Sequence, residues 1–183
     1  NGVFGIKLHY KHLKQNIGSV ERMRELFPNA TYLLIRRSDV LAQAVSYAKA
    51  KQTGVWIHGQ PKNGEAKYDY RLITSCLTDV LEETAYWRQI LSIPRLPFFE
   101  ICFEDVIRDI PEAVRYIASA SGVSINESDL PSAAPTERQT SRINDEWIRR
   151  YSEETSRKKC SLPDYSVSRT LLQRAKAELL KII

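Results

Sequence analysis

The spacing of apolar and polar positions along the chain predicts strands that alternate with helices. Three short apolar stretches with β-branched or aromatic members are typical of strands: residues 3–10 (VFGIKLHY), 31–35 (TYLLI) and 97–104 (PFFEICFE). The second stretch is continuously apolar, which is the pattern of a parallel strand that is covered on both faces. It is therefore expected to lie inside a sheet.

Helical spacing separates these stretches. It covers residues 19–28, which Pro28 closes, residues 68–92, and residues 111–122, which begin with Pro111 and end at Gly122. Asp39 is a good N-cap for a helix after the second strand, whose apolar stripe comprises Val40, Leu41, Ala44, Val45 and Ala48. On helix 68–92 the positions expected to face inward are Ile73, Leu77, Val80, Leu81 and either Tyr86 or Trp87. A helical segment around Trp147 and an amphipathic helix over 166–183 complete the pattern.

Composition narrows the class of protein. A length of 183 residues, with 43% hydrophobic and 27% charged positions, favours a single soluble domain over 1–183. Strands that alternate with helices argue that this domain is an α/β fold of three layers around a central parallel sheet. The net charge of +5 favours anionic partners, but basic and acidic residues are mixed along the chain, which argues against a nucleic-acid-binding module. No apolar run reaches the length of a membrane span. The scattered Cys76, Cys102 and Cys160 are expected to be reduced thiols in the cytoplasm, without metal-ligand spacing.

Two adjacent arginines follow the second strand directly. Arg36 and Arg37 are expected at the carboxyl end of a parallel strand, where open α/β sheets bind their ligands. An arginine fork fits phosphate oxygens, and the N-terminus of the helix that Asp39 caps also favours an anion. Ser46, two turns into that helix, offers a hydroxyl. The pattern fits a nucleotide phosphate site, and it equally fits an exposed strand end with two solvated arginines.

Residues 26–54 (LFPNATYLLIRRSDVLAQAVSYAKAKQTG) resemble the 3′-phosphate motif of sulfotransferases that use 3′-phosphoadenosine 5′-phosphosulfate (PAPS). Within that superfamily, which has a P-loop-like fold, the chain is most similar to the bacterial trehalose 2-sulfotransferase-like group. The resemblance implies that Arg36, with Arg37 in reserve, and Ser46 hold the 3′-phosphate. It also implies PAPS as co-substrate without a metal, and a possible homodimer to which the C-terminal helix contributes.

Two later stretches carry the same resemblance. Residues 97–123 resemble the family's late strand, acidic pair and following helix. Residues 135–154 (PTERQTSRINDEWIRRYSEE) resemble a C-terminal segment whose basic loop closes over the nucleotide. The resemblance assigns a contact with the 3′-phosphate to Arg138 and Gln139, with Arg142 as a substitute.

The first predicted strand offers a base. Lys7 and His9 share one face of a strand at 3–10, because side chains alternate there. In animal sulfotransferases a Lys-x-His at a similar strand end supplies the catalytic base, so the resemblance makes His9 the base and lets Lys7 stabilise the departing phosphate. In the trehalose-like group a glutamate nearer the N-terminus is thought to have this role. The alternative is that both side chains merely lie at a strand end.

Two further expectations concern the donor and the acceptor. No P-loop-like turn for the 5′-phosphosulfate occurs in the sequence, and since it begins at Asn1 we expect a lost N-terminal segment. In the trehalose-like group the stretch after the serine helix borders the acceptor pocket. Gln52, Thr53, Trp56 and His58 offer an aromatic face and polar groups that suit a sugar there.

The resulting hypothesis is a cytoplasmic sulfotransferase that moves a sulfuryl group from PAPS to a hydroxyl of a carbohydrate or glycolipid acceptor. The alternative is a non-catalytic or degenerate nucleotide-binding relative. A P-loop kinase would need a G-x-x-x-x-G-K-S/T loop, which the sequence does not contain.

Overall fold

The computed structural model describes residues 4–57, 59–92, 96–133 and 142–158. It divides the chain into a unit of residues 1–148 and a unit of residues 149–183. The described part of the second unit is the last part of helix α7 (Arg142–Arg157) and one further residue. The predicted C-terminal helix at 166–183 and Cys160 lie outside the described residues.

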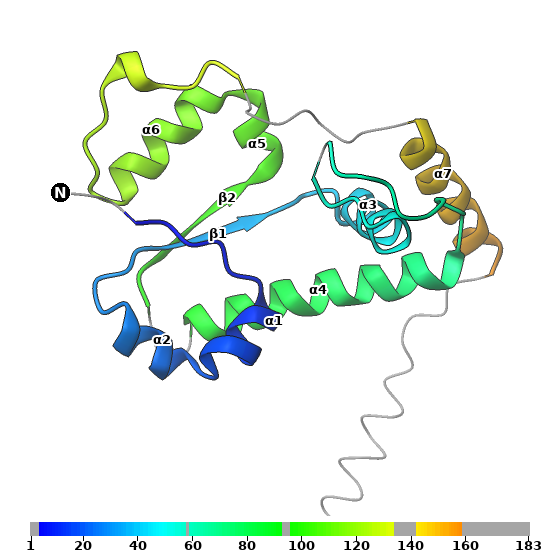
Figure 1. The fold of residues 1–183 in the computed structure, drawn as a ribbon, viewed down its shortest axis with the longest axis horizontal. Coiled ribbons are helices and arrows are strands. Elements are labelled where there is room, and N and C mark those ends of the chain that lie inside the picture. Colours follow the sequence, from blue (N-terminus) through cyan, green and yellow to red (C-terminus); the bar gives the residue numbers. More distant parts are fainter. Residues whose placement is uncertain (1–3, 58, 93–95, 134–141, 159–183) are drawn as a thin grey trace, which may run out of the picture. The chain divides into compact units, whose positions relative to one another are not determined.

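A parallel pair of strands lies in the first unit (Figure 1). β1 (Tyr32–Arg36) and β2 (Phe98–Cys102) confirm the strands predicted at 31–35 and 97–104 and their parallel direction. The second strand ends earlier than predicted because α5 (Phe103–Arg108) begins directly after it. The register pairs Arg36 with Cys102, so the carboxyl ends of both strands meet at one edge of the sheet.

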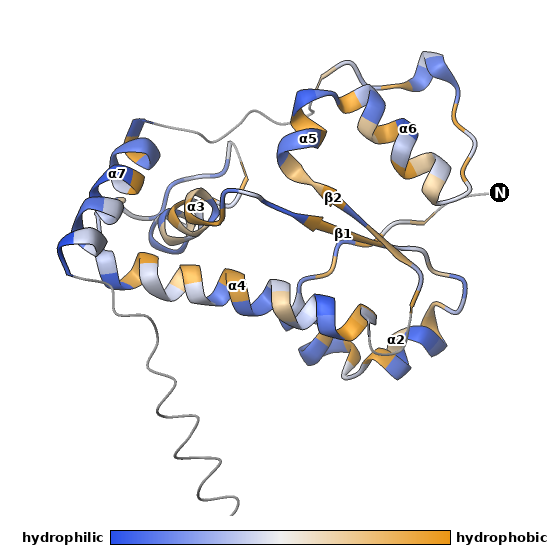
Figure 2. Ribbon diagram, turned by 180° about the vertical axis from the view of Figure 1, so that it is seen from behind, coloured by the Kyte–Doolittle hydropathy of each residue, from blue (hydrophilic) through white to orange (hydrophobic). Residues whose placement is uncertain are grey.

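One face of this sheet packs against apolar side chains, and the opposite face is exposed at Ile35. Leu34 is buried against Leu91 and Leu96, and Figure 2 shows that the strands themselves are largely apolar. Ile35 points to the opposite face, because side chains alternate along a strand, and it is 58% exposed. The prediction that 31–35 is covered on both faces is therefore wrong at Ile35 for the part of the chain described.

The predicted strand at 3–10 is wrong. Residues 4–9 have no regular secondary structure, and a short helix α1 (Tyr10–His12) and a π-helical turn η1 (Leu13–Ile17) follow. A strand needs a neighbour for its backbone hydrogen bonds, whereas here a helix supplies the partners. The Tyr10 N–H donates to Glu83 Oε1 at 2.7 Å, and the Tyr10 ring stacks on Tyr86.

Two helices position the residues that follow β1. α3 (Val40–Thr53) begins where Asp39 accepts a hydrogen bond from the Ala42 N–H, which confirms the predicted cap. It packs along α4 (Tyr70–Ser92). The buried residues of the two helices are Ala44, Val45, Ala48, Ala50, Thr53, Ile73, Cys76, Val80 and Leu91.

The inward face of α4 differs from the prediction at Leu81. Ile73 and Val80 are buried as expected, and Leu77 and Trp87 are partly buried. Leu81 is 50% exposed. Of the alternatives Tyr86 and Trp87, Trp87 is the one that packs against the core, while Tyr86 is exposed. Ile73, Cys76 and Val80 are spaced three and four residues apart, so they form one stripe, and Leu81 lies a rotation of about 100° beyond it.

The first unit holds further helices. Among them are α2 (Val20–Leu26), which Ser19 caps, and α6 (Ile110–Ala120), which has Pro111 in its first turn and Gly122 beyond its end as predicted. A 3₁₀ turn, η2 (Glu127–Asp129), follows α6. Within the described ranges, no helix is both long and apolar enough to cross a membrane.

Candidate functional site

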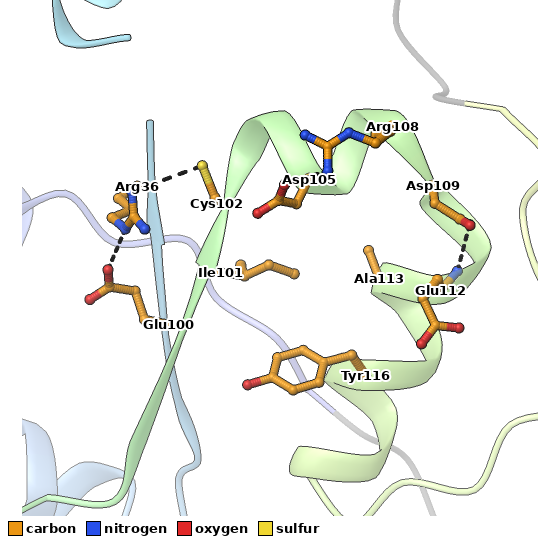
Figure 3. A pocket seen from close by; sticks show the side chains of 10 residues that line it. All are labelled: Arg36, Glu100, Ile101, Cys102, Asp105, Arg108, Asp109, Glu112, Ala113 and Tyr116. Carbon is orange, nitrogen blue, oxygen red and sulfur yellow. Dashed lines mark hydrogen bonds and ion pairs between the residues drawn. The ribbon is translucent and has the colours of Figure 1, made fainter. Parts of the chain in front are cut away.

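Arg36 lines a cavity of about 530 Å³ at the carboxyl ends of the strands. Figure 3 shows Arg36 and Glu100 on one side of the cavity and Glu112 and Tyr116, from α6, on the other. Cavities of this size are common for small-molecule sites. Arg108 also lines it, but its Nη1 pairs with Asp105 Oδ1 at 3.0 Å. Polar and apolar groups line the cavity in similar measure, and its charged side chains are two arginines, Arg36 and Arg108, and four carboxylates, Glu100, Asp105, Asp109 and Glu112.

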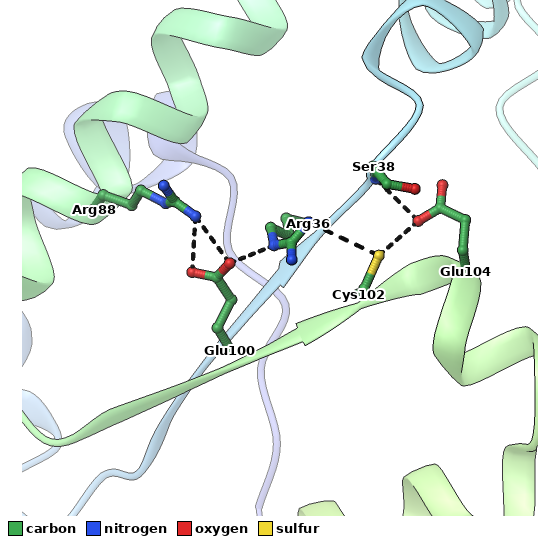
Figure 4. A network of polar contacts seen from close by, with 6 residues as sticks. All are labelled: Arg36, Ser38, Arg88, Glu100, Cys102 and Glu104. Atoms are coloured by element: carbon green, nitrogen blue, oxygen red, sulfur yellow. Dashed lines mark hydrogen bonds and ion pairs between the residues drawn. The ribbon is translucent and has the colours of Figure 1, made fainter.

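The Arg36 guanidinium is held by a carboxylate that it shares with a second arginine (Figure 4). Its Nε donates to Glu100 Oε1, while Arg88 Nη2 donates to Glu100 Oε1 at 2.9 Å and to Oε2 at 3.2 Å. Two guanidinium groups share one carboxylate, so Glu100 does not pair with Arg36 alone. Glu100 orients Arg36 through its Nε and leaves the Nη groups of Arg36 outside this ion pair.

A thiol and a second carboxylate continue the network. Arg36 Nη1 lies 4.0 Å from Cys102 Sγ, and that thiol donates to Glu104 Oε2 at 2.9 Å. The Ser38 N–H donates to the same carboxylate oxygen at 3.0 Å. Glu104 thus ties the start of α5 to the loop between β1 and α3. Desolvation favours a higher pKa, but the hydrogen bonds from Cys102 and Ser38 outweigh it and lower the pKa of Glu104 to about 2.

We expect Glu104→Gln to lower the free energy of unfolding near neutral pH. Because the folded-state pKa of Glu104 lies below the ordinary value of 4.5, its carboxylate stabilises the fold above that value, and the contribution is lost as the pH falls towards 2. The difference between parent and variant should therefore shrink on acidification. Urea unfolding at a series of pH values from neutral towards 2 measures this difference in the free energy of unfolding. Glu82→Gln, on the exposed side of α4, is the control. A difference that stays constant with pH would contradict the assignment.

The structure gives the two adjacent arginines different partners. Arg37 does not join Arg36 at Glu100: its guanidinium carbon lies 4.2 Å from the centroid of the Phe103 ring, a cation–π contact. Arg36 is the one that lines the cavity. This arrangement makes Arg36 the stronger candidate for an anion at this position.

Ser46 lies on α3, and a residue that the sequence did not single out contacts it. Asn144 Nδ2 donates to Ser46 Oγ at 3.1 Å. Asn144 follows Arg142 closely in the stretch 135–154, so the resemblance pointed to its neighbourhood but not to its side chain. Arg142 is exposed at the start of α7. Arg138 and Gln139 lie outside the described residues.

Two of the predicted acceptor residues hold the loop after α3. Gln52 Nε2 donates to the Lys67 carbonyl at 2.9 Å, and Gln52 Oε1 accepts from the Lys67 N–H at 2.8 Å. Thr53 is buried, and its hydroxyl donates to the Lys49 carbonyl at 2.9 Å. An added Cβ at Gly64 would lie 2.5 Å from the Gln52 carbonyl oxygen, so the loop approaches α3 closely. An acceptor would have to share these side chains with the loop.

Trp56 is exposed, unlike Gln52 and Thr53, the other predicted acceptor residues that the structure describes. It is 57% exposed, and its ring centroid lies 5.8 Å from that of Tyr47. Lys51 Nζ lies 4.3 Å from the Tyr47 ring centroid. Trp56 of the loop and Tyr47 of α3 thus form an aromatic surface beside Lys51, which pairs with Asp79. His58 lies outside the described residues.

Lys7 and His9 do not share the face of a strand, because no strand forms there. Both side chains are exposed, and His9 Nδ1 lies 3.8 Å from Glu83 Oε1. Its ring meets that of His12 edge-on at 5.3 Å. The role of His9 as the base stays a prediction. Among the described residues, no group of three or more His, Cys, Asp or Glu side chains is placed to hold a metal ion.

Comparison with known proteins places this architecture in a family. The sequence model of the Stf0 sulphotransferase family matches residues 1–154. The chain belongs to this family. The match includes β1, the arginine pair, α3 and β2, and it confirms the resemblance to sulfotransferases.

Two relatives are similar to this chain. The trehalose 2-sulfotransferase of Mycolicibacterium smegmatis is 28% identical over 173 residues, and that of Mycobacterium tuberculosis is 27% identical over 172. Each alignment covers 86% of this chain and 63% of the relative. The chain therefore spans less than two thirds of the length of these curated relatives.

Proposed function

We propose that the protein is a sulfotransferase that takes a sulfuryl group from PAPS, and that Arg36 and Ser46 bind the 3′-phosphate of this donor. The observation that carries the proposal is the place of Arg36. It lies at the carboxyl end of a parallel strand, before a capped helix, and beside a cavity of suitable size. A three-layer, P-loop-like fold and a cytoplasmic location belong to the same proposal.

The hydrogen-bonding capacity of Arg36 supports this role. A guanidinium has five N–H donors, and Arg36 uses Nε for Glu100 and places Nη1 near the Cys102 thiol. The Nη groups retain donors that two phosphate oxygens can accept, since arginine and phosphate pair bidentately. The Glu100 carboxylate would hold the guanidinium plane in place while the phosphate binds. Arg37, Arg138 and Gln139 are the further candidates for the same phosphate.

The transfer itself needs few protein groups. A hydroxyl oxygen of the acceptor attacks the sulfur in line and forms the new S–O bond. The bond from sulfur to the 5′-phosphate oxygen breaks, and adenosine 3′,5′-bisphosphate leaves with those electrons. A base accepts the hydroxyl proton, for which His9 is the candidate in this chain, with Lys7 near the developing charge. The anchored 3′-phosphate contributes positioning, on which in-line transfer depends.

A carbohydrate or glycolipid is the proposed acceptor class. The Trp56 and Tyr47 rings supply the apolar surface on which a sugar face can stack. Gln52, Thr53 and His58 are the proposed polar contacts. Because the two relatives are named trehalose 2-sulfotransferase, trehalose is the first acceptor to assay with PAPS.

Calorimetric titration tests the donor site directly. We expect adenosine 3′,5′-bisphosphate to bind about tenfold or more tightly than adenosine 5′-monophosphate, because hydrogen bonds to a charged group contribute about 1.5–3 kcal/mol. The two nucleotides differ only in the 3′-phosphate, so the ratio of their Kd values isolates that group. Equal Kd values would contradict the proposed site. Preference for the bisphosphate without transfer from PAPS to any hydroxyl would instead favour the non-catalytic alternative.

A further inference from the structure

The Asn144 side chain contacts α3 through both ends of its amide. Asn144 is only 6% exposed, and it lies in the first turn of α7, inside the unit of residues 1–148. Its Nδ2 donates to Ser46 Oγ at 3.1 Å, and its Oδ1 accepts from Lys49 Nζ at 3.2 Å. Ser46 and Lys49 are three residues apart on a helix, so they lie on the same face. The amide therefore spans two neighbouring side chains of α3.

Lys49 determines which way the amide points. A lysine ammonium group donates hydrogen bonds and cannot accept them, so the atom facing Lys49 must be the amide oxygen. The amide nitrogen consequently faces Ser46, and it too can only donate. The Ser46 oxygen is therefore the acceptor in this contact, and its own hydrogen must point elsewhere. Lys49 and Asn144 also take part in other interactions.

This constraint affects what Ser46 can do for an anion. Serine hydroxyls inside helices often donate to the carbonyl one turn earlier, but in the described part of the chain the Ser46 hydroxyl donates no hydrogen bond. A phosphate with charged oxygens requires donors. A serine whose lone pair is occupied by Asn144 keeps its hydrogen available for such an acceptor.

We propose that Asn144 is a positioning residue for the donor site: it orients the Ser46 hydroxyl so that its hydrogen is donated to the 3′-phosphate. The inference rests on the proposed function, because it requires Ser46 to contact that phosphate. Asn144 does not touch the nucleotide in this scheme. It acts through Ser46, and Lys49 acts through Asn144 by fixing the direction of the amide.

The test replaces the donor end of the amide and little else. Asn144→Asp keeps the shape and still accepts from Lys49, but the atom facing Ser46 becomes an acceptor. The Ser46 hydroxyl then donates to this carboxylate and no longer to the phosphate. We expect the Kd of adenosine 3′,5′-bisphosphate to rise about tenfold, as for the loss of a hydrogen bond to a charged group. The Kd of adenosine 5′-monophosphate should stay the same.

A double-mutant cycle separates this effect from the added negative charge. The same substitution is made in a Ser46→Ala background, where no hydroxyl is left to orient. We expect Asn144→Asp to change the Kd of the bisphosphate less than about twofold there. Asn16→Asp, at an exposed position of η1, controls for the change in net charge. Circular dichroism and thermal unfolding show which variants fold. If Asn144→Asp does not fold, Asn144→Ala replaces it in the cycle.

The outcomes decide between the inference and the proposed function. An effect of Asn144→Asp that disappears without the Ser46 hydroxyl supports the inference. An effect of equal size in both backgrounds, or no effect of Asn144→Asp in the parent, overturns the inference. The proposed function is still supported in that case if the parent prefers the bisphosphate. If the parent binds both nucleotides equally, the proposed function fails and the inference fails with it.

Discussion

Replacing Arg36 by glutamine is expected to raise the Kd of adenosine 3′,5′-bisphosphate about thirtyfold or more, and to remove the preference over adenosine 5′-monophosphate. Two charge-assisted hydrogen bonds are lost, each contributing about 1.5–3 kcal/mol. The fold should tolerate the change, because Glu100 keeps its contacts with Arg88. We therefore expect the free energy of unfolding to change by less than about 1 kcal/mol, as for a partly exposed ion pair. Calorimetry and urea unfolding measure the two quantities.

Arg71→Gln is the matched control for this substitution. Arg71 is exposed on α4 and is not among the residues that line the cavity. Its replacement therefore removes the same charge as Arg36→Gln but outside the proposed site. It should leave the ratio of the two Kd values unchanged. If Arg71→Gln weakens binding as much as Arg36→Gln does, net charge and not a specific phosphate contact explains the affinity. If Arg36→Gln unfolds the chain, Arg36 is a structural residue and the site assignment loses its support.

Ile73→Ala is expected to destabilise the protein by about 2–5 kcal/mol, the range for truncating a large buried aliphatic side chain. Ile73 is fully buried on α4, which packs along α3. The substitution removes apolar contacts and leaves a cavity between two helices that can close only in part. For a chain of this size, each kcal/mol corresponds to a fall of roughly 2–4 °C in Tm. Thermal and urea unfolding check the expectation.

The control lies on the same helix. Leu81 has the same number of side-chain carbons as Ile73 and is 50% exposed, so Leu81→Ala should cost about 1 kcal/mol or less. The hydrophobic pattern alone would place both residues in the core. Equal losses for the two variants would show that Leu81 is covered in solution and that the structure assigns the wrong face of α4 to the core.

The sequence determined the features of this protein that depend on neighbours along the chain. The strands at 31–35 and 97–104, the cap at Asp39 and the end of α6 before Gly122 were all predicted and are present. Each depends on local chemistry: a run of apolar β-formers, a side chain that reaches an N–H three residues ahead, and a residue that tolerates a positive φ. The placement of Arg36 at a strand end followed from the same local pattern.

Tertiary contacts decided the rest. Residues 4–9 contain a strand-like pattern, but a strand requires a neighbouring strand. The adjacent Tyr10 instead donates its N–H to Glu83 and stacks on Tyr86, both on α4. Leu81 is as apolar as the core residues of α4, yet its exposure depends on where α3 packs. Arg36 and Arg88 meet at Glu100, and Asn144 meets Ser46, across 98 residues in the last case. No local propensity encodes such pairs, because the energy that selects them exists only once distant segments have come together.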